Sequence, residues 1–170
     1  MKRPQVTVIG SHEESRFMVE AYEIGRHIAR RNWILVCGGR GGIMEAASRG
    51  ASAEGGIVVG ILPGVDFNDA NPYLTAAIAS GIGFARNSMN VLSGDVVVAI
   101  GGRTGTMSEL SYAFQYGRPM IICSFADGWS AGFADLALRE DDRSLIHMAA
   151  TPIEAMDTLD ALLGGETARS

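Results

Sequence analysis

The feature that most constrains the fold is a regular alternation of short apolar runs with longer segments of helical period. Runs such as "QVTVIG" (5–10), "WILVCGG" (33–39) and "DVVVAIGG" (95–102) contain almost no polar residues. Strands that expose one face alternate apolar and polar residues, whereas strands of a parallel sheet covered on both faces are continuously apolar. The pattern therefore predicts an α/β fold with a doubly wound, mostly parallel sheet between two helical layers.

The rest of the chain fits the same alternation. We expect helices at 15–32, 41–56, 84–94, 104–117 and 151–165, strands at 57–63, 118–125 and 144–150, a weak strand within 75–83, and loops at 64–74 and 126–142. The last helix has a complete start signal, because Thr151 is an N-cap residue, Pro152 suits the first helical position, and Glu154 completes a capping box.

Length and composition favour one globular domain. The 170 residues suit a single domain, which we place at residues 1–165 with a frayed tail at 166–170. Apolar residues make up 47% of the chain and charged residues 19%, which is typical of a protein with an ordinary core.

Charge and hydropathy argue against several classes of partner. The net charge of −5 argues against nucleic acid as a ligand, since a surface that binds nucleic acid needs a basic patch. No apolar run reaches the ~20 residues of a membrane span, and the N-terminus does not resemble a signal peptide. We therefore expect a cytoplasmic protein with no membrane partner. Cys37 and Cys123 end apolar runs and are expected to be buried, reduced thiols, and their spacing does not suggest a metal site.

Glycine-rich turns follow three of the expected strands. They are "GS" (10–11), "GGRGG" (38–42) and "GGRTGT" (101–106), and the last two lead directly into helices. Ligands of open parallel sheets bind beyond the carboxyl ends of the strands, and a helix N-terminus offers unpaired N–H groups to a phosphate. None of the turns matches the Walker A or the dinucleotide-binding pattern. We expect a phosphate site built from Gly10, Ser11, Gly38, Gly39, Gly41, Gly42, Gly101, Gly102, Arg103, Thr104, Gly105 and Thr106.

Two charged residues beside these turns are candidates for chemistry. Glu109 lies near the start of the helix that follows the third turn, where it is either a functional carboxylate or the partner of Thr106 in a capping box. Arg86 follows another strand-to-helix turn and is either a ligand contact or a surface residue. An arginine and a carboxylate beside a phosphate site suggest a nucleotide-like ligand, whose sugar cation the carboxylate would stabilise or for which it would activate water.

Three further residues are weaker candidates. His12 follows the first turn and is expected at the rim of the site. Asn90 lies four residues after Arg86, on the same helix face, and would contact either the ligand or an adjacent loop. Trp129 would either stack on a ligand ring or make a core or dimer contact.

The glycine turns carry a resemblance to a known family. "GGRTGTMSEL" (101–110) resembles the P-G-G-x-G-T-x-x-E signature of the "lonely guy" (LOG) family, formerly called lysine decarboxylases. "CGGRGGIMEAASRGA" (37–51) resembles the second glycine loop of that family, and "GFARNSMNVLSGDVVVAIGG" (83–102) resembles its arginine-bearing helix and the following strand. The resemblance extends over residues 5–125.

This resemblance implies a Rossmann-like fold, a homodimer or higher homo-oligomer, and cleavage of the N-glycosidic bond of nucleoside 5′-monophosphates without a metal or redox cofactor. It gives Arg86 and Glu109 the catalytic positions, and Gly101, Gly102, Gly105 and Thr106 the phosphate cradle.

Four features depart from the LOG pattern: Ile100 replaces a proline, Asn87 replaces a lysine, Arg103 and Thr104 make the third turn bulkier and more basic, and the loop at 64–74 is short. In these features the chain is similar to a sister branch that includes the molybdenum cofactor carrier proteins. That branch implies a different function, in which the cofactor, a phosphorylated pterin, is bound and not cleaved. The sequence therefore leaves two hypotheses open, a phosphoribohydrolase and a non-catalytic carrier. Both require a small phosphorylated ligand, nucleotide or pterin, at the glycine turns.

Overall fold

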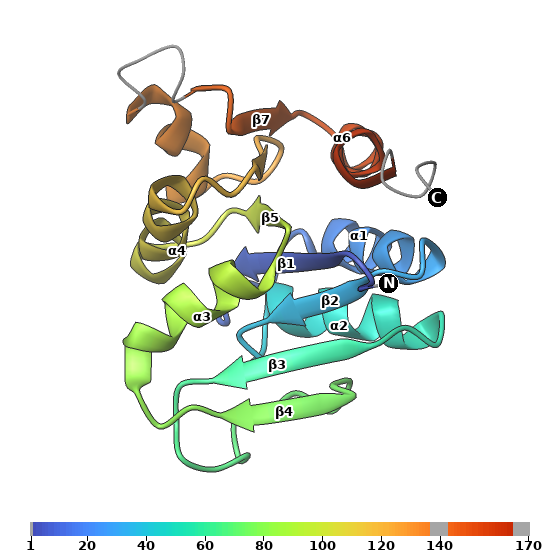
Figure 1. The fold of residues 1–170 in the computed structure, drawn as a ribbon, viewed down its shortest axis with the longest axis vertical. Helices are drawn as coiled ribbons and strands as arrows, with labels where there is room; N and C mark the ends of the chain where they lie inside the picture. Colours follow the sequence, from blue (N-terminus) through green and yellow to red (C-terminus); the bar gives the residue numbers. More distant parts are fainter. Residues whose placement is uncertain (1, 137–142, 165–170) are drawn as a thin grey trace.

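The computed structural model describes residues 2–136 and 143–164. These residues form one sheet of seven parallel strands in the order β4-β3-β2-β1-β5-β6-β7 (Figure 1). The strands are β1 (Gln5–Gly10), β2 (Ile34–Cys37), β3 (Val58–Leu62), β4 (Ala76–Ala79), β5 (Val96–Ile100), β6 (Met120–Cys123) and β7 (Ile146–Ala149).

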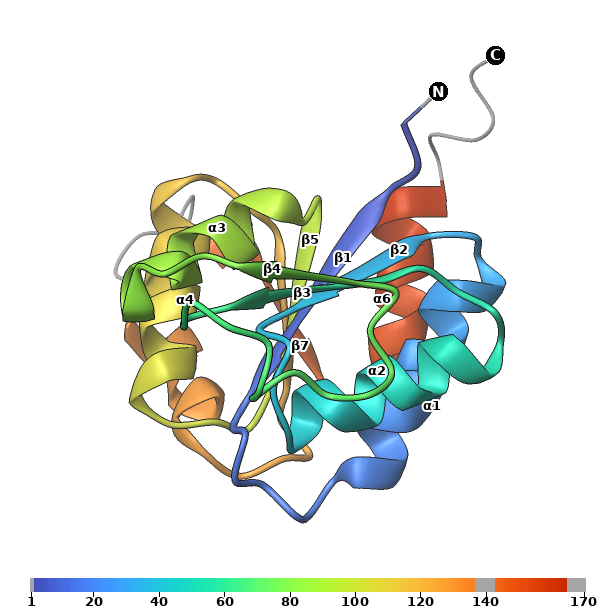
Figure 2. The same ribbon diagram turned by 90° about the horizontal axis from the view of Figure 1, so that it is seen from below.

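Helices cover both faces of the sheet, as Figure 2 shows. One face carries α1 (Met18–Arg30), α2 (Ile43–Ala53) and α6 (Pro152–Leu163). The other carries α3 (Arg86–Ser93) and α4 (Thr104–Gln115), together with the 3₁₀ segments η1 (Gly83–Ala85) and η2 (Trp129–Leu136). The predicted three-layer, doubly wound α/β fold is therefore confirmed.

The direction of winding reverses at β1. The chain adds β2, β3 and β4 on one side of β1 and then crosses back to place β5 on its other side. At this junction Gly10 is the register partner of Ile100, so the first and third glycine turns leave the sheet side by side. Such a reversal opens a crevice beyond the carboxyl ends of the two strands, because their connections leave toward opposite faces.

The continuous apolar runs are explained by two cores, one on each face. In β5, Val96, Val98 and Ile100 face α1, α2 and α6, whereas Val97 and Ala99 face α3 and α4. All five side chains are buried. A strand enclosed in this way has no solvent-facing position at which a polar residue is favoured.

The α1 and α2 helices pack so closely that their backbones nearly touch. A Cβ atom at Gly25 of α1 would lie 2.0 Å from the carbonyl oxygen of Ala47 in α2. Because the obstructing atom belongs to the backbone of a packed helix, only glycine fits at this crossing.

The described segments differ from the predicted ones mainly at their ends. The helix expected from residue 15 begins at Met18, after Phe17 adopts a left-handed backbone with φ of 61°. The segment 126–142, predicted as a loop with at most one helical turn, contains the eight-residue η2. Its residues 137–142 and the predicted tail at 166–170 lie outside the described residues. The capping role of Thr151 is confirmed, because its hydroxyl accepts the Glu154 N–H at 3.1 Å.

In the described ranges, no helix combines the length and apolar character needed to cross a bilayer.

The α1–α2 contact yields a stability prediction. Gly25→Ala should destabilise the protein by about 1–3 kcal/mol, because overpacking against a backbone outweighs the ~1 kcal/mol that alanine adds to helix propensity. Urea denaturation of the variant measures this change. Gly132→Ala is the control, since a Cβ there meets no atom within 4 Å. Equal stability of the two variants would contradict the close contact.

Candidate functional site

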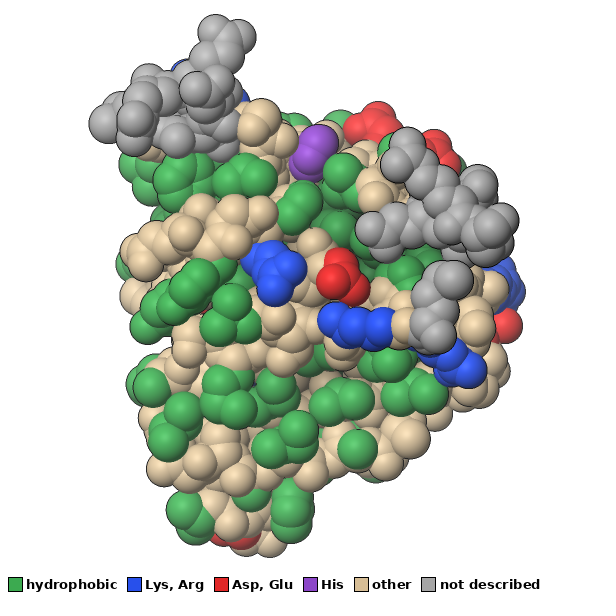
Figure 3. All heavy atoms as spheres, viewed as in Figure 1, with side chains coloured by type: hydrophobic (Ala, Val, Ile, Leu, Met, Phe, Trp, Pro, Cys, Tyr) green, Lys and Arg blue, Asp and Glu red, His purple; other side chains and the backbone are tan. Residues whose placement is uncertain are grey.

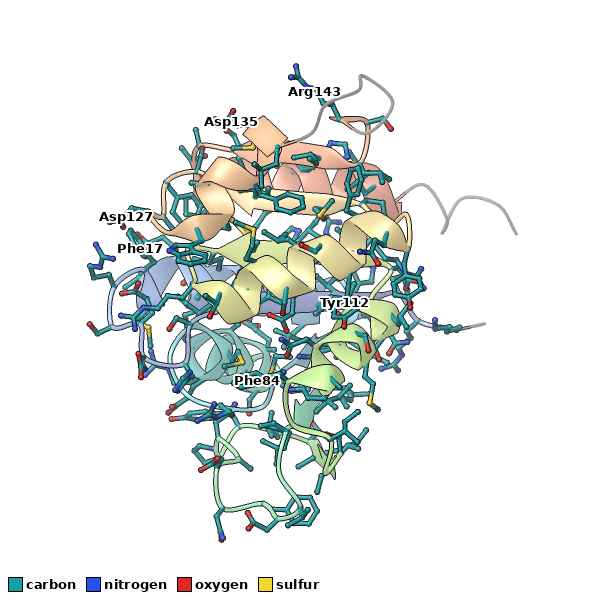
Figure 4. All side chains as sticks on the ribbon, turned by 90° about the vertical axis from the view of Figure 1, so that its left-hand side faces the viewer. Phe17, Phe84, Tyr112, Asp127, Asp135 and Arg143 are labelled. Carbon is teal, nitrogen blue, oxygen red and sulfur yellow. The ribbon has the colours of Figure 1, made fainter. Side chains whose placement is uncertain are left out.

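A cleft of about 260 Å³ opens where β1 and β5 end, between the glycine turns and the starts of α2, α3 and α4. We call it the central cleft. Figure 4 views the molecule from the side toward which β1 to β4 point. The residues that line the cleft are Gly10, Ser11, His12, Glu13, Arg40, Met44, Phe84, Arg86, Asn87, Arg103, Thr104, Gly105, Thr106 and Glu109.

Arg86, the first residue of α3, brings a buried positive charge to the cleft. Its side chain is only 8% exposed, and the guanidinium packs against Gly38, where a Cβ would lie 2.4 Å from Nη1. The nearest carboxylate oxygen, Glu109 Oε1, is 3.9 Å from Nη1, which exceeds hydrogen-bond distance. The buried Nε atom has no hydrogen-bond partner among the described residues. The guanidinium thus has several unused donors beside an open cleft.

Glu109 lies in α4 and is held by a short chain of hydrogen bonds. The Asn90 side-chain amide donates to Glu109 Oε1 at 3.0 Å. The backbone carbonyl of Asn90 in turn accepts the Thr7 hydroxyl at 2.7 Å, so that β1 fixes α3, and α3 fixes the carboxylate. Asn90 itself is fully buried, and its side-chain oxygen has no partner in the described chain. Asn90 therefore contacts helix α4, and not the adjacent loop that the sequence suggested.

Burial shifts the acid–base behaviour of this pair. Removal from water raises the pKa of Glu109 to about 7, while the Asn90 hydrogen bond and the Arg86 charge oppose the rise. Burial lowers the pKa of Arg86, and Glu109 opposes that shift. An arginine nonetheless remains protonated in proteins. Near neutral pH the pair therefore holds one permanent positive charge beside a carboxyl group that exchanges its proton readily.

The N-terminus of α4 faces the same cleft and presents unpaired backbone donors. The amides of Thr104, Gly105 and Thr106 have no acceptor within the described residues, and Arg103, at the N-cap position, makes no side-chain cap. Three free N–H groups at a helix N-terminus form a favourable site for a phosphate.

The capping-box alternative for Glu109 is wrong. Thr106 is the third residue of α4 and lies inside the helix, so it cannot serve as the N-cap. Glu109 instead points to the buried side of α4, where Asn90 contacts it. The helix begins two residues before Thr106 because the chain already turns at Gly101 and Gly102, both with positive φ.

The predicted site residues separate into two groups. Those that line the central cleft are Gly10, Ser11, Arg86, Arg103, Thr104, Gly105, Thr106 and Glu109, joined by His12 at its rim. Those that do not line it are Gly38, Gly39, Gly41, Gly42, Gly101 and Gly102, of which Gly102 lines a neighbouring cavity. At Gly38 the missing side chain makes room for Arg86.

Five lining residues were not predicted from the sequence, and one of them, Glu13, follows the first glycine turn. Arg40 belongs to the second glycine turn, Met44 to α2, and Phe84 and Asn87 flank Arg86. Asn87 is buried and donates to the Ser108 hydroxyl at 2.8 Å, which provides a second link between α3 and α4. Its position next to Arg86 was the available signal in the sequence.

A larger cavity of about 450 Å³ adjoins the central cleft. It lies between the segment after β1 and the turn at 127–129, and we call it the second cavity. Ser11, Glu13 and Arg103 line both spaces. The remaining residues of its lining are Glu14, Ser15, Arg16, Gly102, Asp127, Gly128 and Trp129.

Neither cysteine lines the central cleft. Cys37 and Cys123 are both free and buried, and burial raises the pKa of each thiol, that of Cys123 to about 12. Both are therefore protonated and unreactive at neutral pH. Within residues 2–136 and 143–164, no three His, Cys, Asp or Glu side chains gather in a way that would hold a metal ion.

Comparison with known proteins identifies the family. The model of the SLOG cluster4 family matches residues 3–156. The chain belongs to this family. An uncharacterized protein of Archaeoglobus fulgidus is 40% identical over 120 residues, which cover 69% of this chain and 78% of that protein.

Two solved structures are similar over nearly their whole length. The molybdenum cofactor binding protein of the phototrophic bacterium Rippkaea orientalis is 34% identical, with a TM-score of 0.86 over 95% of this chain and 98% of the other. The molybdenum cofactor carrier protein of Chlamydomonas reinhardtii is 32% identical, with a TM-score of 0.84 over 96% and 99%. The expected resemblance to LOG-like Rossmann proteins, in the branch that includes these carriers, is therefore confirmed.

The raised pKa of Glu109 predicts a pH-dependent stability. Its folded pKa lies above the unfolded value of 4.5, so the folded state retains a proton that the unfolded state has lost. The stabilisation that this retained proton gives the folded state is complete below pH 4.5 and is lost as the pH rises to about 7. The stability of Glu109→Gln relative to the parent should thus rise by about 1–3 kcal/mol between pH 5 and pH 8. Urea titrations at both pH values measure it, and a difference independent of pH would refute the shift.

Proposed function

We propose that this protein is a carrier of a phosphorylated pterin of the molybdenum cofactor class. The phosphate would lie in the central cleft, against the free amides at the start of α4 and the Arg86 guanidinium. The carrier would bind the cofactor without changing it covalently.

The observation that carries this proposal is the unsatisfied Arg86 guanidinium. Burying an arginine costs several kcal/mol unless its donors are used, and a carboxylate at 3.9 Å uses them poorly. A phosphate accepts two N–H donors of a guanidinium at once and also accepts helix N-terminal amides. Arg40 and Arg103 add positive charge to the cleft, against the carboxyl groups of Glu13 and Glu109. A dianionic group would therefore complete the site.

The similar structures favour a pterin over a nucleotide as the ligand. The Rippkaea orientalis protein binds molybdenum cofactor, and the Chlamydomonas reinhardtii protein is a carrier of it. Each is more than 30% identical to this chain and matches it almost end to end. A shared function at that similarity agrees with the net positive charge of the residues that line the central cleft.

Hydrolysis of a nucleoside 5′-monophosphate is the second candidate. Glu109 favours it, because a carboxyl group with a pKa of about 7 can hold or release a proton at neutral pH. Its neighbour Arg86 would hold the phosphoribosyl unit. This function would make Arg86 and Glu109 catalytic, whereas a carrier uses them only to bind.

Binding of the intact cofactor separates the two candidates. The protein is mixed with molybdenum cofactor under anaerobic conditions and passed through a gel-filtration column. Pterin is then measured by fluorescence after oxidation, and molybdenum by mass spectrometry. A carrier should elute with stoichiometric amounts of both.

In parallel, a panel of nucleoside 5′-monophosphates is tested for release of free base by the parent and by Glu109→Ala. Base release that the variant lacks, with no retained pterin, would establish the hydrolase instead.

Gly105 allows a direct test of the phosphate position. A Cβ at Gly105 meets no protein atom within 4 Å, so Gly105→Ala should fold normally and even gain up to ~1 kcal/mol of helix stability. The added methyl group would stand in the cleft beside the free amides. We expect affinity for a phosphorylated pterin to fall about tenfold or more, as measured by calorimetry.

Gly132→Ala provides the matched control, because its Cβ also meets open space and Gly132 lies outside the central cleft. Equal affinities of the Gly105 and Gly132 variants would show that the phosphate binds elsewhere.

We further propose that the carrier forms a homo-oligomer through the α3–β4 surface. Apolar side chains cover this part of the molecule, as Figure 3 shows in its lower half. Phe84 is 81% exposed there and also lines the central cleft, so a second copy on this surface would cover the open side of the site. The exposed apolar side chains on these elements and the turn between them are Ile78, Ile82, Phe84, Met89 and Leu92.

Sedimentation velocity tests this assembly. Phe84→Glu should shift the protein to monomers, because a charge would have to be buried in the interface. Val19→Glu is the control, since Val19 is similarly exposed but lies on α1, on the opposite face of the sheet. A monomeric parent, or an assembly insensitive to Phe84→Glu, would contradict the proposed surface.

A further inference from the structure

The second cavity differs from the central cleft in its charge. Two arginines and three carboxylates line it, so that unlike the central cleft it does not favour a phosphate. The arginines are Arg16 and Arg103, and the carboxylates are those of Glu13, Glu14 and Asp127. A group with N–H donors fits such a lining better than an anion does.

The cavity also has an aromatic wall. Trp129 is 53% exposed, so half of this large side chain is available to a ligand. Its backbone N–H donates to the Gly102 carbonyl at 3.0 Å, which fixes the 127–129 turn on the third glycine turn. Gly128 allows this contact, because a Cβ there would lie 2.7 Å from the Gly101 carbonyl carbon. The position of Trp129 relative to the phosphate site is therefore set by direct backbone contact.

Asp127 supplies a carboxylate beside the same wall. One of its oxygens accepts Arg16 Nη1 at 3.0 Å, and its side chain is 68% exposed. Figure 4 shows Asp127 at the edge of the molecule on the side of the cleft. A carboxylate next to an aromatic face can bind the edge of a flat heterocycle that stacks on that face.

The boundary between the two spaces is an exposed ion pair. Arg103 Nη1 and Glu13 Oε2 are 2.7 Å apart, and both side chains are more than half exposed. Exposed pairs of this kind contribute little to stability, so a ligand that spans both spaces can displace this one.

From this arrangement we infer that the second cavity binds the ring of the ligand through its 2-amino-4-oxopyrimidine edge. Pterins and guanine share this edge, in which a ring N–H and an exocyclic NH₂ point the same way and together match one carboxylate. Asp127 would accept both donors while the ring stacks on Trp129. The inference rests on the proposed function, since it takes the phosphate to be held at the start of α4. It adds a ring subsite and a specificity that the phosphate site alone does not provide.

Matched nucleotides test the edge recognition. GMP and AMP carry the same ribose phosphate, but adenine lacks the paired donors. We expect calorimetry to show about tenfold or tighter binding of GMP than of AMP to the parent protein, because a site built to pair with a donor rejects the analogue that lacks it. Asp127→Asn should remove this preference by weakening GMP alone.

Two further variants test whether the preference for GMP comes from the Asp127 carboxylate itself. Asp135→Asn changes an acidic residue of η2 that does not line the second cavity, and should leave the preference intact. Arg16→Gln removes the ion pair of Asp127 but not its carboxylate. Because Arg16 also lines the cavity, both affinities can change, but the ratio of GMP to AMP affinity should persist. Loss of the preference in Arg16→Gln would mean that Asp127 acts only through that ion pair, which would overturn the inference.

A fluorescent pterin tests the stacking. The probe is the metal-free oxidation product of the cofactor pterin that retains its phosphate. Its fluorescence should be quenched on binding to the parent, and Trp129→Leu should abolish the quenching and weaken binding about tenfold. Unchanged quenching in this variant would place the ring elsewhere.

The outcomes also separate this inference from the proposed function. If GMP and AMP bind equally and Gly105→Ala weakens both, the phosphate site stands and the ring subsite is refuted. If neither nucleotide nor the pterin probe binds the parent, the proposed function fails and the ring subsite fails with it.

Discussion

The all-parallel sheet is the constraint on which the rest of the structure depends. Parallel neighbours cannot be joined by a tight turn, so every connection must cross a face of the sheet. Here the crossings change direction at β1, which leaves the ends of β1 and β5 adjacent and uncovered. Both strands end in glycine turns, and the starts of α2, α3 and α4 meet at that place. The backbone topology alone thus accounts for the cleft and for the helix N-termini around it.

The Arg86–Glu109 pair uses this cleft at a cost to stability. The attraction within a buried ion pair rarely offsets the free energy lost when both charges leave water. A separation of 3.9 Å weakens that attraction further. The rise in the pKa of Glu109 has the same origin. The surroundings nevertheless hold the pair firmly, with Asn90 on the carboxylate and Gly38 against the guanidinium. A charged pair that is fixed in position but has few hydrogen-bond partners is typical of a ligand-binding site.

The sequence predicted what depends on local pattern. The apolar runs predicted the parallel sheet, and the glycine turns predicted the edge at which Arg86 and Glu109 meet. It could not predict contacts set by packing between distant segments. Burial of Arg86 depends on Gly38 in another turn, and the second cavity joins the segment after β1 to the turn at 127–129. The capping-box alternative failed for the same reason, since the start of α4 depends on how the preceding glycines turn.

The central claim is that one phosphorylated ligand binds with its phosphate at the start of α4. A crystal structure of the protein with the phosphorylated, metal-free pterin tests it most directly. We predict phosphate oxygens within hydrogen-bond distance of the Thr104, Gly105 and Thr106 amides and of the Arg86 guanidinium, with that guanidinium drawn toward the phosphate. A pterin bound with its phosphate away from these amides, or with Arg86 still unpaired, would contradict the account.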